Sequence, residues 1–216
     1  MLPLPDLSTF TIFLAAALVI AVAPGPGIFY VAARSLAGGR GVGLASSFGT
    51  GLGGLVHVAA GALGVSAILL ASAEAFTALK LIGAAYLVYL GISLWRSGAS
   101  VLPQRPRGAK AGGSARRALR DGILVEALNP KTAAFFLAFL PQFVDPAAGG
   151  VALQFLLLGT ISVALNTAAD VTVVFTATAV QGRLAASARL TRWLRRGAGA
   201  LICGLGFSLA VSETPR

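Results

Sequence analysis

Long apolar segments recur along the whole sequence, and this feature most constrains the fold. A helix that crosses about 30 Å of hydrocarbon needs about 20 apolar residues. Only 11% of the residues are charged, whereas an average soluble domain has about 25%. We therefore predict an all-α, polytopic membrane protein with six transmembrane helices at roughly residues 8–33, 42–70, 75–96, 120–144, 151–181 and 192–212.

The basic residues are concentrated in alternate connections between these helices. Because cytoplasmic loops are enriched in Lys and Arg, both termini are predicted to lie outside. The second and fourth connections offer Glu74 and Asp145 as charges. The formal charge of +10 therefore predicts topology and contact with membrane lipids, and the lack of interleaved aromatic residues argues against nucleic-acid binding. The basic residues are Arg34 and Arg40 in the first connection, Arg96, Arg105, Arg107, Lys110, Arg116, Arg117 and Arg120 in the third, and Arg183, Arg189, Arg192, Arg195 and Arg196 in the fifth.

The longest connection, at about residues 97–119, is rich in Gly, Pro, Ala and Arg and has no apolar periodicity. It is predicted to be a cytoplasmic linker within one transmembrane domain, residues 1–216. The linker separates halves at about 1–96 and 120–216. Because each half has three helices, the halves have opposite orientations in the membrane. The sequence therefore predicts a 3+3 inverted-topology repeat, which is common among secondary transporters.

Proline interrupts two of the predicted helices. The first contains Pro24-Gly25-Pro26-Gly27, and the fourth contains Asn129-Pro130 at a comparable depth. An interior proline costs a helix about 3 kcal/mol and frees a carbonyl, which hydrocarbon tolerates only where protein or water satisfies the break. Asn129 suits an N-cap and Pro130 the first position of a new half-helix, and Gly25-Pro26 suits the same positions. Helices 1 and 4 are therefore predicted to be broken, with a site between them.

The new half-helices would begin with unpaired amides near the membrane midplane. Such N-termini bind carboxylates, because free N–H groups and the helix dipole both favour negative charge. Lys131 would add a positive charge for the substrate; alternatively, it pairs with an acid or reaches the inner surface. The substrate-binding residues predicted at the breaks are Pro24, Gly25, Pro26, Gly27, Ile28, Asn129, Pro130, Lys131 and Thr132.

Glu126 and Asp170 place carboxylates inside apolar helices. A charge at the centre of a membrane helix costs about 2.5–3.5 kcal/mol on insertion scales, so such residues usually have a role. We predict that these two acids bind a substrate ammonium, carry a coupled proton, or do both. The structural alternative is that they only neutralise Lys131.

The helix at 42–70 carries Gly49, Gly53, His57 and Gly61 at steps of four. Small residues at this spacing allow close packing, either within one chain or between two chains of a homo-oligomer. His57 is either a hydrogen-bonded packing residue or a third candidate for proton coupling, since imidazole exchanges protons near neutral pH. With a single His and the single Cys203, neither a disulfide framework, a metal site nor a cofactor is predicted.

Three motifs occur in order along essentially the whole chain. They are Pro24-Gly25-Pro26, the run from Gly83 to Gly91, and Asn129-Pro130-Lys131 followed by the run from Phe135 to Val144. In combination they closely resemble the lysine exporter (LysE) family of bacterial amino-acid efflux transporters, of the threonine/homoserine exporter type. The resemblance implies a multi-pass protein of the bacterial inner membrane that exports amino acids or related compounds from the cytoplasm, coupled to the proton gradient.

The chain departs from the family's pattern at three positions. Many members place Asp or Asn directly after the first motif and an acid ahead of the histidine region, where this chain has Gly27 and Gly54. It also has Glu126 where Asn is common. The acidic role is therefore predicted to rest on Glu126 and Asp170, and a neutral zwitterion is favoured over lysine or arginine as substrate.

Together, these features predict a secondary exporter of a small amino acid or related zwitterion that works by alternating access. The alternative from another class is an ion channel or a metal-ion exporter on a related scaffold. A metal exporter would be expected to show clustered His, Cys or carboxylates on facing helices. An enzyme is not predicted, because no Ser/His/Asp or metal-centred constellation is recognisable in the sequence.

Overall fold

The computed structural model describes residues 5–96, 114–179, 196–197, 200, 202–207 and 210–211. The regular structure of these residues is entirely helical, which confirms the predicted all-α class. Of the predicted helix at 192–212, only the scattered residues named above are described, and they are helical. The helices are α1 (Leu7–Val22), α2 (Pro26–Ala71), α3 (Ala73–Arg96), α4 (Ala115–Ala127), α5 (Pro130–Ala134), the π-helix η1 (Phe135–Phe139), the 3₁₀-helix η2 (Leu140–Phe143) and α6 (Val151–Ala179).

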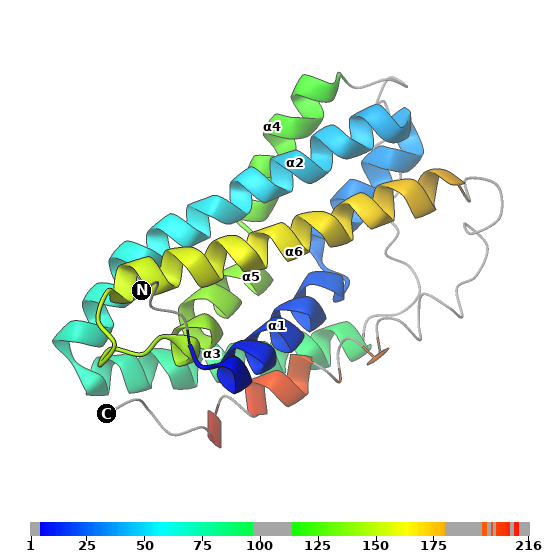
Figure 1. Cartoon of the computed structure of the whole chain (residues 1–216). Coiled ribbons are helices and arrows are strands. Elements are labelled where there is room, and N and C mark those ends of the chain that lie inside the picture. The colour runs from blue at the N-terminus through cyan, green and yellow to red at the C-terminus, as the bar shows by residue number, and fades with distance from the viewer. Residues whose placement is uncertain are drawn as a thin grey trace.

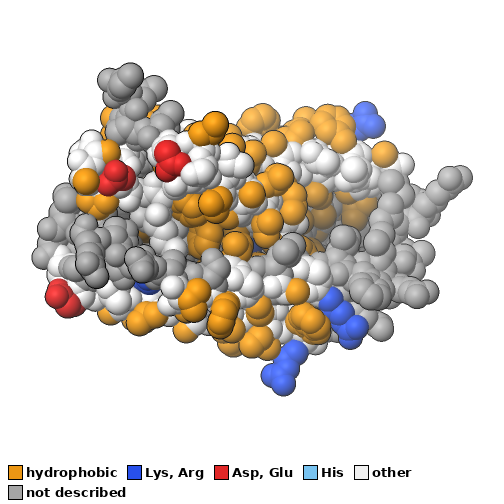
Figure 2. All heavy atoms as spheres, turned by 60° about the horizontal axis from the view of Figure 1, so that its bottom comes forward, with side chains coloured by type: hydrophobic (Ala, Val, Ile, Leu, Met, Phe, Trp, Pro, Cys, Tyr) orange, Lys and Arg blue, Asp and Glu red, His pale blue; other side chains and the backbone are white. Residues whose placement is uncertain are grey.

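The helices pack around a core that α2 and α6 run along (Figure 1). α2 contacts both α4 and α6, α1 lies against α6, and α3 lies against η1. Phe13, Leu87, Phe135 and Phe155 are among the fully buried side chains. In Figure 2, hydrophobic side chains cover the middle of one face, acidic side chains lie at one end, and most basic side chains in view lie toward the other. An apolar exterior of this kind suits contact with lipid.

By length and hydropathy, two described helical stretches can cross a membrane: Pro26–Gly64 and Val151–Ala179. The pair Ala115–Ala127 and Pro130–Phe143, which is bent by 44°, adds a third if it forms one broken span. α1 and the stretch Lys80–Ser93 are apolar but shorter. The predicted arrangement of six spans in two inverted halves therefore stays a prediction. The broken and the short helices are each too short to count as a membrane span by themselves.

Gly39 divides α2 into two helical segments, residues 26–38 and 40–71. It has φ 76° and ψ −173°. A Cβ atom on Gly43 would meet the Ser35 side chain, although residues 35 and 43 of a straight helix would be about 12 Å apart. The chain therefore turns back at this glycine (Figure 1). The predicted non-helical connection between residues 33 and 42 is too long: only Gly39 departs from helical geometry, because one residue with positive φ suffices for the turn.

Gly39→Ala is expected to lower the free energy of unfolding by about 1–3 kcal/mol, because only glycine adopts this backbone conformation without strain. Among the described residues, no atom lies within 4 Å of the position that a Cβ would take, so strain rather than crowding is the cause. Gly41→Ala is the matched control, since Gly41 is equally open but helical. Thermal unfolding in detergent compares the two variants, and equal losses of stability would contradict the argument.

The glycines of the 42–70 helix pack within the chain. A Cβ on Gly49 would meet the Leu119 carbonyl of α4, and one on Gly53 would lie 2.5 Å from the Ile123 carbonyl oxygen. A Cβ on Gly61 would meet the Phe155 ring of α6. These glycines therefore let α2 approach α4 and α6 closely, which is one of the two uses left open by the sequence. Homo-oligomerisation stays a prediction.

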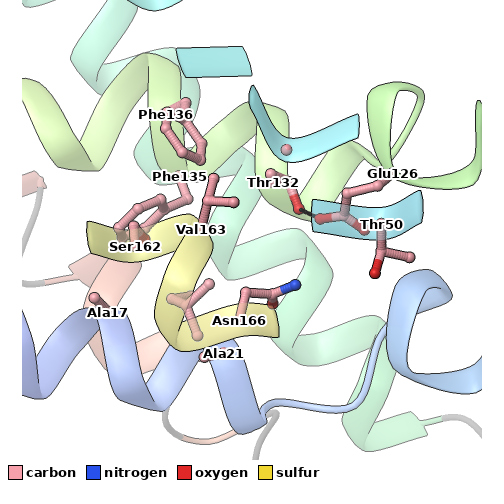
Figure 3. Close-up of a pocket in the computed structure, with 12 residues that line it drawn as sticks. Ala17, Ala21, Thr50, Glu126, Thr132, Phe135, Phe136, Ser162, Val163 and Asn166 are labelled. Carbon is pink, nitrogen blue, oxygen red and sulfur yellow. Dashed lines mark hydrogen bonds between the residues drawn. The ribbon is translucent and has the colours of Figure 1, made fainter. Parts of the chain in front are cut away.

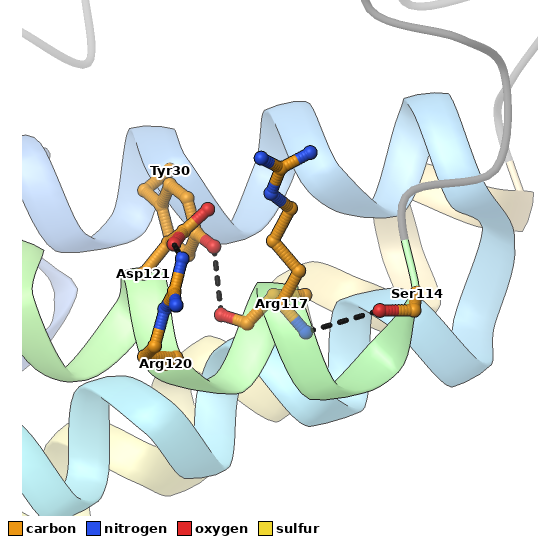
Figure 4. A network of polar contacts seen from close by, with 6 residues as sticks. Tyr30, Ser114, Arg117, Arg120 and Asp121 are labelled. Atoms are coloured by element: carbon orange, nitrogen blue, oxygen red, sulfur yellow. Dashed lines mark hydrogen bonds and ion pairs between the residues drawn. The ribbon is translucent and has the colours of Figure 1, made fainter.

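Side-chain caps decide where two of the helices begin. Asp6 caps α1, and the hydrogen bonds from the Ser8 and Thr9 hydroxyls hold the pKa of its carboxyl below the ordinary value. The resulting negative charge lies at the positive end of the helix dipole. Ser114 caps α4 by accepting the Arg117 amide at 3.3 Å (Figure 4), so α4 begins at Ala115, inside the predicted linker.

A polar contact joins the segment 26–38 to α4 near the start of α4. The Tyr30 hydroxyl donates a hydrogen bond of 2.7 Å to the Ala118 carbonyl oxygen (Figure 4). On the same helix, Arg120 and Asp121 form an ion pair of 3.7 Å. Both side chains of that pair are substantially exposed, so the pair contributes little to stability. The hydrogen bond of Tyr30 instead connects two segments that are far apart in the sequence.

Candidate functional site

Both predicted helix breaks are present, and the structure brings them together. α1 ends at Val22 and α2 begins at Pro26, while α4 ends at Ala127 and α5 begins at Pro130. A Cβ atom on Gly25 would lie 3.3 Å from the Cδ and Cε atoms of Lys131. A Cβ atom on Gly27 would lie 2.5 Å from Glu126 Oε2. The absence of side chains at these two glycines therefore lets one break touch the other.

The α4–α5 break has the predicted capping chemistry. Asn129 is the N-cap of α5, with its Oδ1 accepting a hydrogen bond of 3.0 Å from the Lys131 amide. Pro130 occupies the first position of the half-helix, where its missing N–H leaves nothing unsatisfied. The Lys131 amide is therefore already occupied by the cap, contrary to the expectation that it is a free donor.

Lys131 connects the second break to the first. Its side chain is buried, and Nζ donates hydrogen bonds to the carbonyl oxygens of Ile20 at 2.9 Å and Ala23 at 3.0 Å. These carbonyls lie at the C-terminal end of α1, where helix carbonyls lack partners and the dipole favours a cation. In the described conformation, the ammonium of Lys131 thus ties α5 to the end of α1.

Glu126 lies at the C-terminal end of α4 and is 2% exposed. Its Oε2 accepts a hydrogen bond of 2.9 Å from Asn129 Nδ2, and its Oε1 accepts one of 2.6 Å from the Thr132 hydroxyl. Both oxygens therefore have a donor from the adjacent break. Hydrogen bonds of this kind stabilise a buried carboxylate in its ionised form.

His57 contacts the backbone beside this carboxylate. Its Nε2 lies 2.9 Å from the Glu126 carbonyl oxygen, and its ring stacks on Phe136 with 6.0 Å between centroids. Because a carbonyl only accepts, Nε2 must carry a proton in this contact. His57 is therefore a hydrogen-bonded packing residue in the described conformation, which is the first of the two roles considered above.

Asp170 lies on α6 and is fully buried. Its Oδ2 lies 2.7 Å from the Thr50 hydroxyl of α2, whereas its Oδ1 is buried with no hydrogen-bond partner among the described residues. An unpaired buried carboxylate oxygen carries a large desolvation cost. Asp170 is therefore in a different chemical setting from Glu126, whose oxygens are both hydrogen-bonded.

A small cavity lies beside the joined breaks (Figure 3). In that view, Thr50, Glu126 and Thr132 lie toward one side and Ala17 and Phe135 toward the other. The first side is thus polar, the second is apolar apart from Ser162, and Glu126 is the one charged residue of the lining. The lining residues are Ala17, Ile20, Ala21, Thr50, Gly54, Glu126, Thr132, Phe135, Phe136, Ser162, Val163 and Asn166.

Of the predicted site residues, Glu126 and Thr132 line this cavity. The others, including Lys131, Asp170 and the glycines of the first break, do not. The sequence contained a signal for part of the missed lining, because Ser162, Asn166 and Asp170 recur at steps of four and form a polar stripe on one face of α6. The apolar lining residues are not distinguishable by sequence from residues that face lipid.

The described residues contain no group of three or more His, Cys, Asp or Glu side chains placed to hold a metal ion. The cavity lining supplies a single carboxylate and three hydroxyls, with one amide, from Asn166. A lining with one charge and several neutral hydrogen-bonding groups suits a small organic molecule that carries an ammonium group.

Comparison with known proteins identifies the family. The sequence model of the LysE type translocator family matches residues 18–213. A membrane protein of Vibrio cholerae is 34% identical over 96% of this chain and 99% of its own length. The homoserine/homoserine lactone efflux protein of Salmonella typhimurium is 31% identical over 71% of this chain and 73% of its own length.

The leucine efflux protein of an Enterobacter species is 29% identical over 70% of this chain and 71% of its own length. No solved structure matches the chain. The family match includes both helix breaks, Glu126 and Asp170, which all lie between residues 18 and 213. The chain therefore belongs to the LysE type translocator family, and it is a transport protein rather than an enzyme.

Proposed function

We propose that the protein exports a small amino acid or related zwitterion from the bacterial cytoplasm, in exchange for protons and by alternating access. The observation that carries the proposal is the small cavity beside two touching helix breaks, with the buried Glu126 in its lining.

The proposed topology has six spans in two inverted halves. α1 and the segment 26–38 form the first, broken span, the segment 40–71 the second and α3 the third. α4, α5, η1 and η2 form the fourth, also broken, and α6 is the fifth. The predicted helix at 192–212 completes the set, with both termini outside. The separation of acidic and basic side chains toward opposite ends in Figure 2 supports this orientation.

In the proposed complex, the substrate ammonium pairs with Glu126. The side chain of the substrate lies against the apolar side of the cavity, which Ile20, Phe135 and Val163 help to form. Its carboxylate takes a neutral donor, the Asn166 amide, because Lys131 is engaged with the end of α1 and the Thr132 hydroxyl with Glu126. The backbone amides of Gly27 and Ile28 are proposed to donate further hydrogen bonds to the substrate carboxylate when the two breaks move apart.

The two acids have different proposed roles. Glu126 lines the cavity and is held by two donors, so it receives the substrate ammonium. Asp170 lies outside the cavity lining and has one oxygen without a partner among the described residues, so it receives the coupled proton. His57 is the less favoured carrier, since its Nε2 is already bonded to the Glu126 carbonyl.

Proteoliposomes that hold the purified protein are expected to exchange leucine and homoserine at least about tenfold faster than lysine or glutamate. Lysine brings a second ammonium and glutamate a second carboxylate, and each unpaired charge in a water-poor cavity costs more than the ~1.4 kcal/mol that a tenfold ratio requires. Counterflow of radiolabelled amino acids measures the ratio, with protein-free liposomes as the control.

Three results of this counterflow experiment would count against parts of the proposal. Equal exchange of lysine and leucine would contradict a preference for uncharged side chains. Exchange of none of the amino acids would contradict the exporter itself. Ion flux that runs down its gradient without any exchange of amino acids would favour the channel alternative.

A further inference from the structure

Thr50 lies between the cavity and the buried Asp170. It lines the cavity on the same side as Glu126 (Figure 3). Its Oγ1 lies 2.7 Å from Asp170 Oδ2 and also 2.7 Å from the Ser47 carbonyl oxygen. Thr50 and Asp170 are both fully buried. The Thr50 side chain therefore lines the cavity, and its hydroxyl contacts the carboxyl group of α6 and the backbone of α2.

The two short contacts of the Thr50 hydroxyl, with Ser47 and Asp170, bear on whether Asp170 is protonated. A hydroxyl has one proton to donate and two lone pairs that accept. An ionised carboxylate and a carbonyl both only accept, so Thr50 cannot donate to Asp170 and to Ser47 at once. Both contacts are hydrogen bonds only when Asp170 Oδ2 carries a proton and donates it to Thr50 Oγ1, while Thr50 donates to the Ser47 carbonyl. The described geometry therefore fits a protonated Asp170.

Loss of that proton must rearrange the chain of hydrogen bonds. The ionised carboxylate can only accept, so the Thr50 proton turns to Asp170 and leaves the Ser47 carbonyl. A Thr hydroxyl bonded to a preceding carbonyl bends a helix, so this release also relaxes α2 at residues 47–50. The partner-free Oδ1 fits the same view, since an unpaired oxygen is less costly on a neutral acid than on an anion.

We propose that Thr50 couples the proton on Asp170 to the substrate in the cavity. A substrate ammonium that docks against Glu126 and Thr50 is separated from Asp170 by this one hydroxyl. The ammonium beside Glu126 and the proton on Asp170 are two positive charges linked through Thr50, so each disfavours the other, which is the requirement for exchange. Other charged groups that act on Asp170 are Glu126 of α4 and Lys131 of α5. This inference rests on the proposed function.

The test uses the full chain in proteoliposomes, with leucine counterflow measured at a series of pH values and no gradient. For the wild type, the apparent affinity is expected to rise by up to about tenfold per pH unit where Asp170 releases its proton. Thr50→Val keeps the shape of the side chain but lacks the hydroxyl, so its apparent affinity for leucine, whatever its value, should change less than about threefold over two pH units. Thr50→Ser should restore the wild-type dependence.

Ser47→Ala is the matched control. It removes a hydroxyl that bonds the Thr167 carbonyl across the same α2–α6 interface at 3.3 Å, and Ser47 contacts Asp170 only through Thr50. This variant should keep the wild-type pH dependence. A Thr50→Val protein with the wild-type pH dependence would overturn the proposal. If wild-type protein exchanges no amino acid at any pH, the proposed function fails instead.

Infrared spectroscopy provides a test that needs no transport. The band of a protonated carboxyl should vanish in Asp170→Asn and shift to higher frequency in Thr50→Val, because the hydroxyl that accepts from it is gone. An unshifted band in Thr50→Val would overturn the link between Thr50 and Asp170, whether or not that variant transports leucine. The band should be unchanged in Ser47→Ala.

Discussion

The Glu126→Gln protein is expected to lose substrate binding by about 10- to 150-fold while it keeps its fold. The glutamine has the same shape and one carbonyl oxygen to accept from Asn129 or Thr132, so the local network changes little. It lacks the negative charge that a substrate ammonium requires, and a hydrogen bond to a charged group contributes about 1.5–3 kcal/mol. Counterflow with leucine, measured as an apparent Kd, checks the loss.

Glu74→Gln is the matched control for this substitution, because Glu74 is exposed at the start of α3 and bonds only the neighbouring Ser72 among the contacts described for it. It should bind leucine as the wild type does. Wild-type affinity in Glu126→Gln would place the ammonium elsewhere. In that case Asp170 would be the remaining buried acid for the substrate, and the division of roles proposed above would be wrong.

The Lys131→Met protein is expected to lose about 2–4 kcal/mol of unfolding free energy. Methionine is similar in length but donates no hydrogen bond, so the Ile20 and Ala23 carbonyls at the end of α1 lose their partner in a buried setting. Removal of a buried charge offsets part of this loss. Thermal or denaturant unfolding in detergent measures the change.

A second variant separates the structural role of Lys131 from a role in binding. Lys131→Gln keeps donors without the charge, so its stability should lie between those of the wild type and Lys131→Met. If Lys131 held the substrate carboxylate, both variants would bind leucine poorly but would bind the corresponding amine, which has no carboxylate, as the wild type does. An unchanged melting temperature in Lys131→Met would instead show that the two bonds do not tie α5 to α1.

The structure gives a physical reason for two departures from the family's pattern. The resemblance described above leads to the expectation of Asp or Asn at position 27 and of Asn at position 126, where this chain has Gly27 and Glu126. In this chain, a Cβ on Gly27 would lie only 2.5 Å from Glu126 Oε2, so the carboxylate of position 126 fills the space beside position 27. In this chain the Glu126 carboxylate therefore places an acid at the contact between the two breaks.

The sequence predicted the parts of the fold that depend on local chemistry. Proline has no N–H and fixes its own φ, so the new half-helices had to begin at Pro26 and Pro130 whatever they packed against. The Asn129 cap follows from the same local rule. The burial of Glu126 and Asp170 followed from their place within apolar helices. None of these features requires knowledge of which segments meet.

Tertiary structure alone decided the features that join distant segments. Lys131 bonds carbonyls on α1, and Thr50 bonds Asp170 on α6; no sequence spacing encodes either partner. Phe135 and Val163 line a cavity, yet they look like lipid-facing residues in the sequence, because membrane helices are apolar on every face. The breaks at Pro24–Gly27 and Asn129–Pro130 were thus both readable from the sequence, whereas the contacts that join them and the apolar residues that line the cavity were decided only by packing.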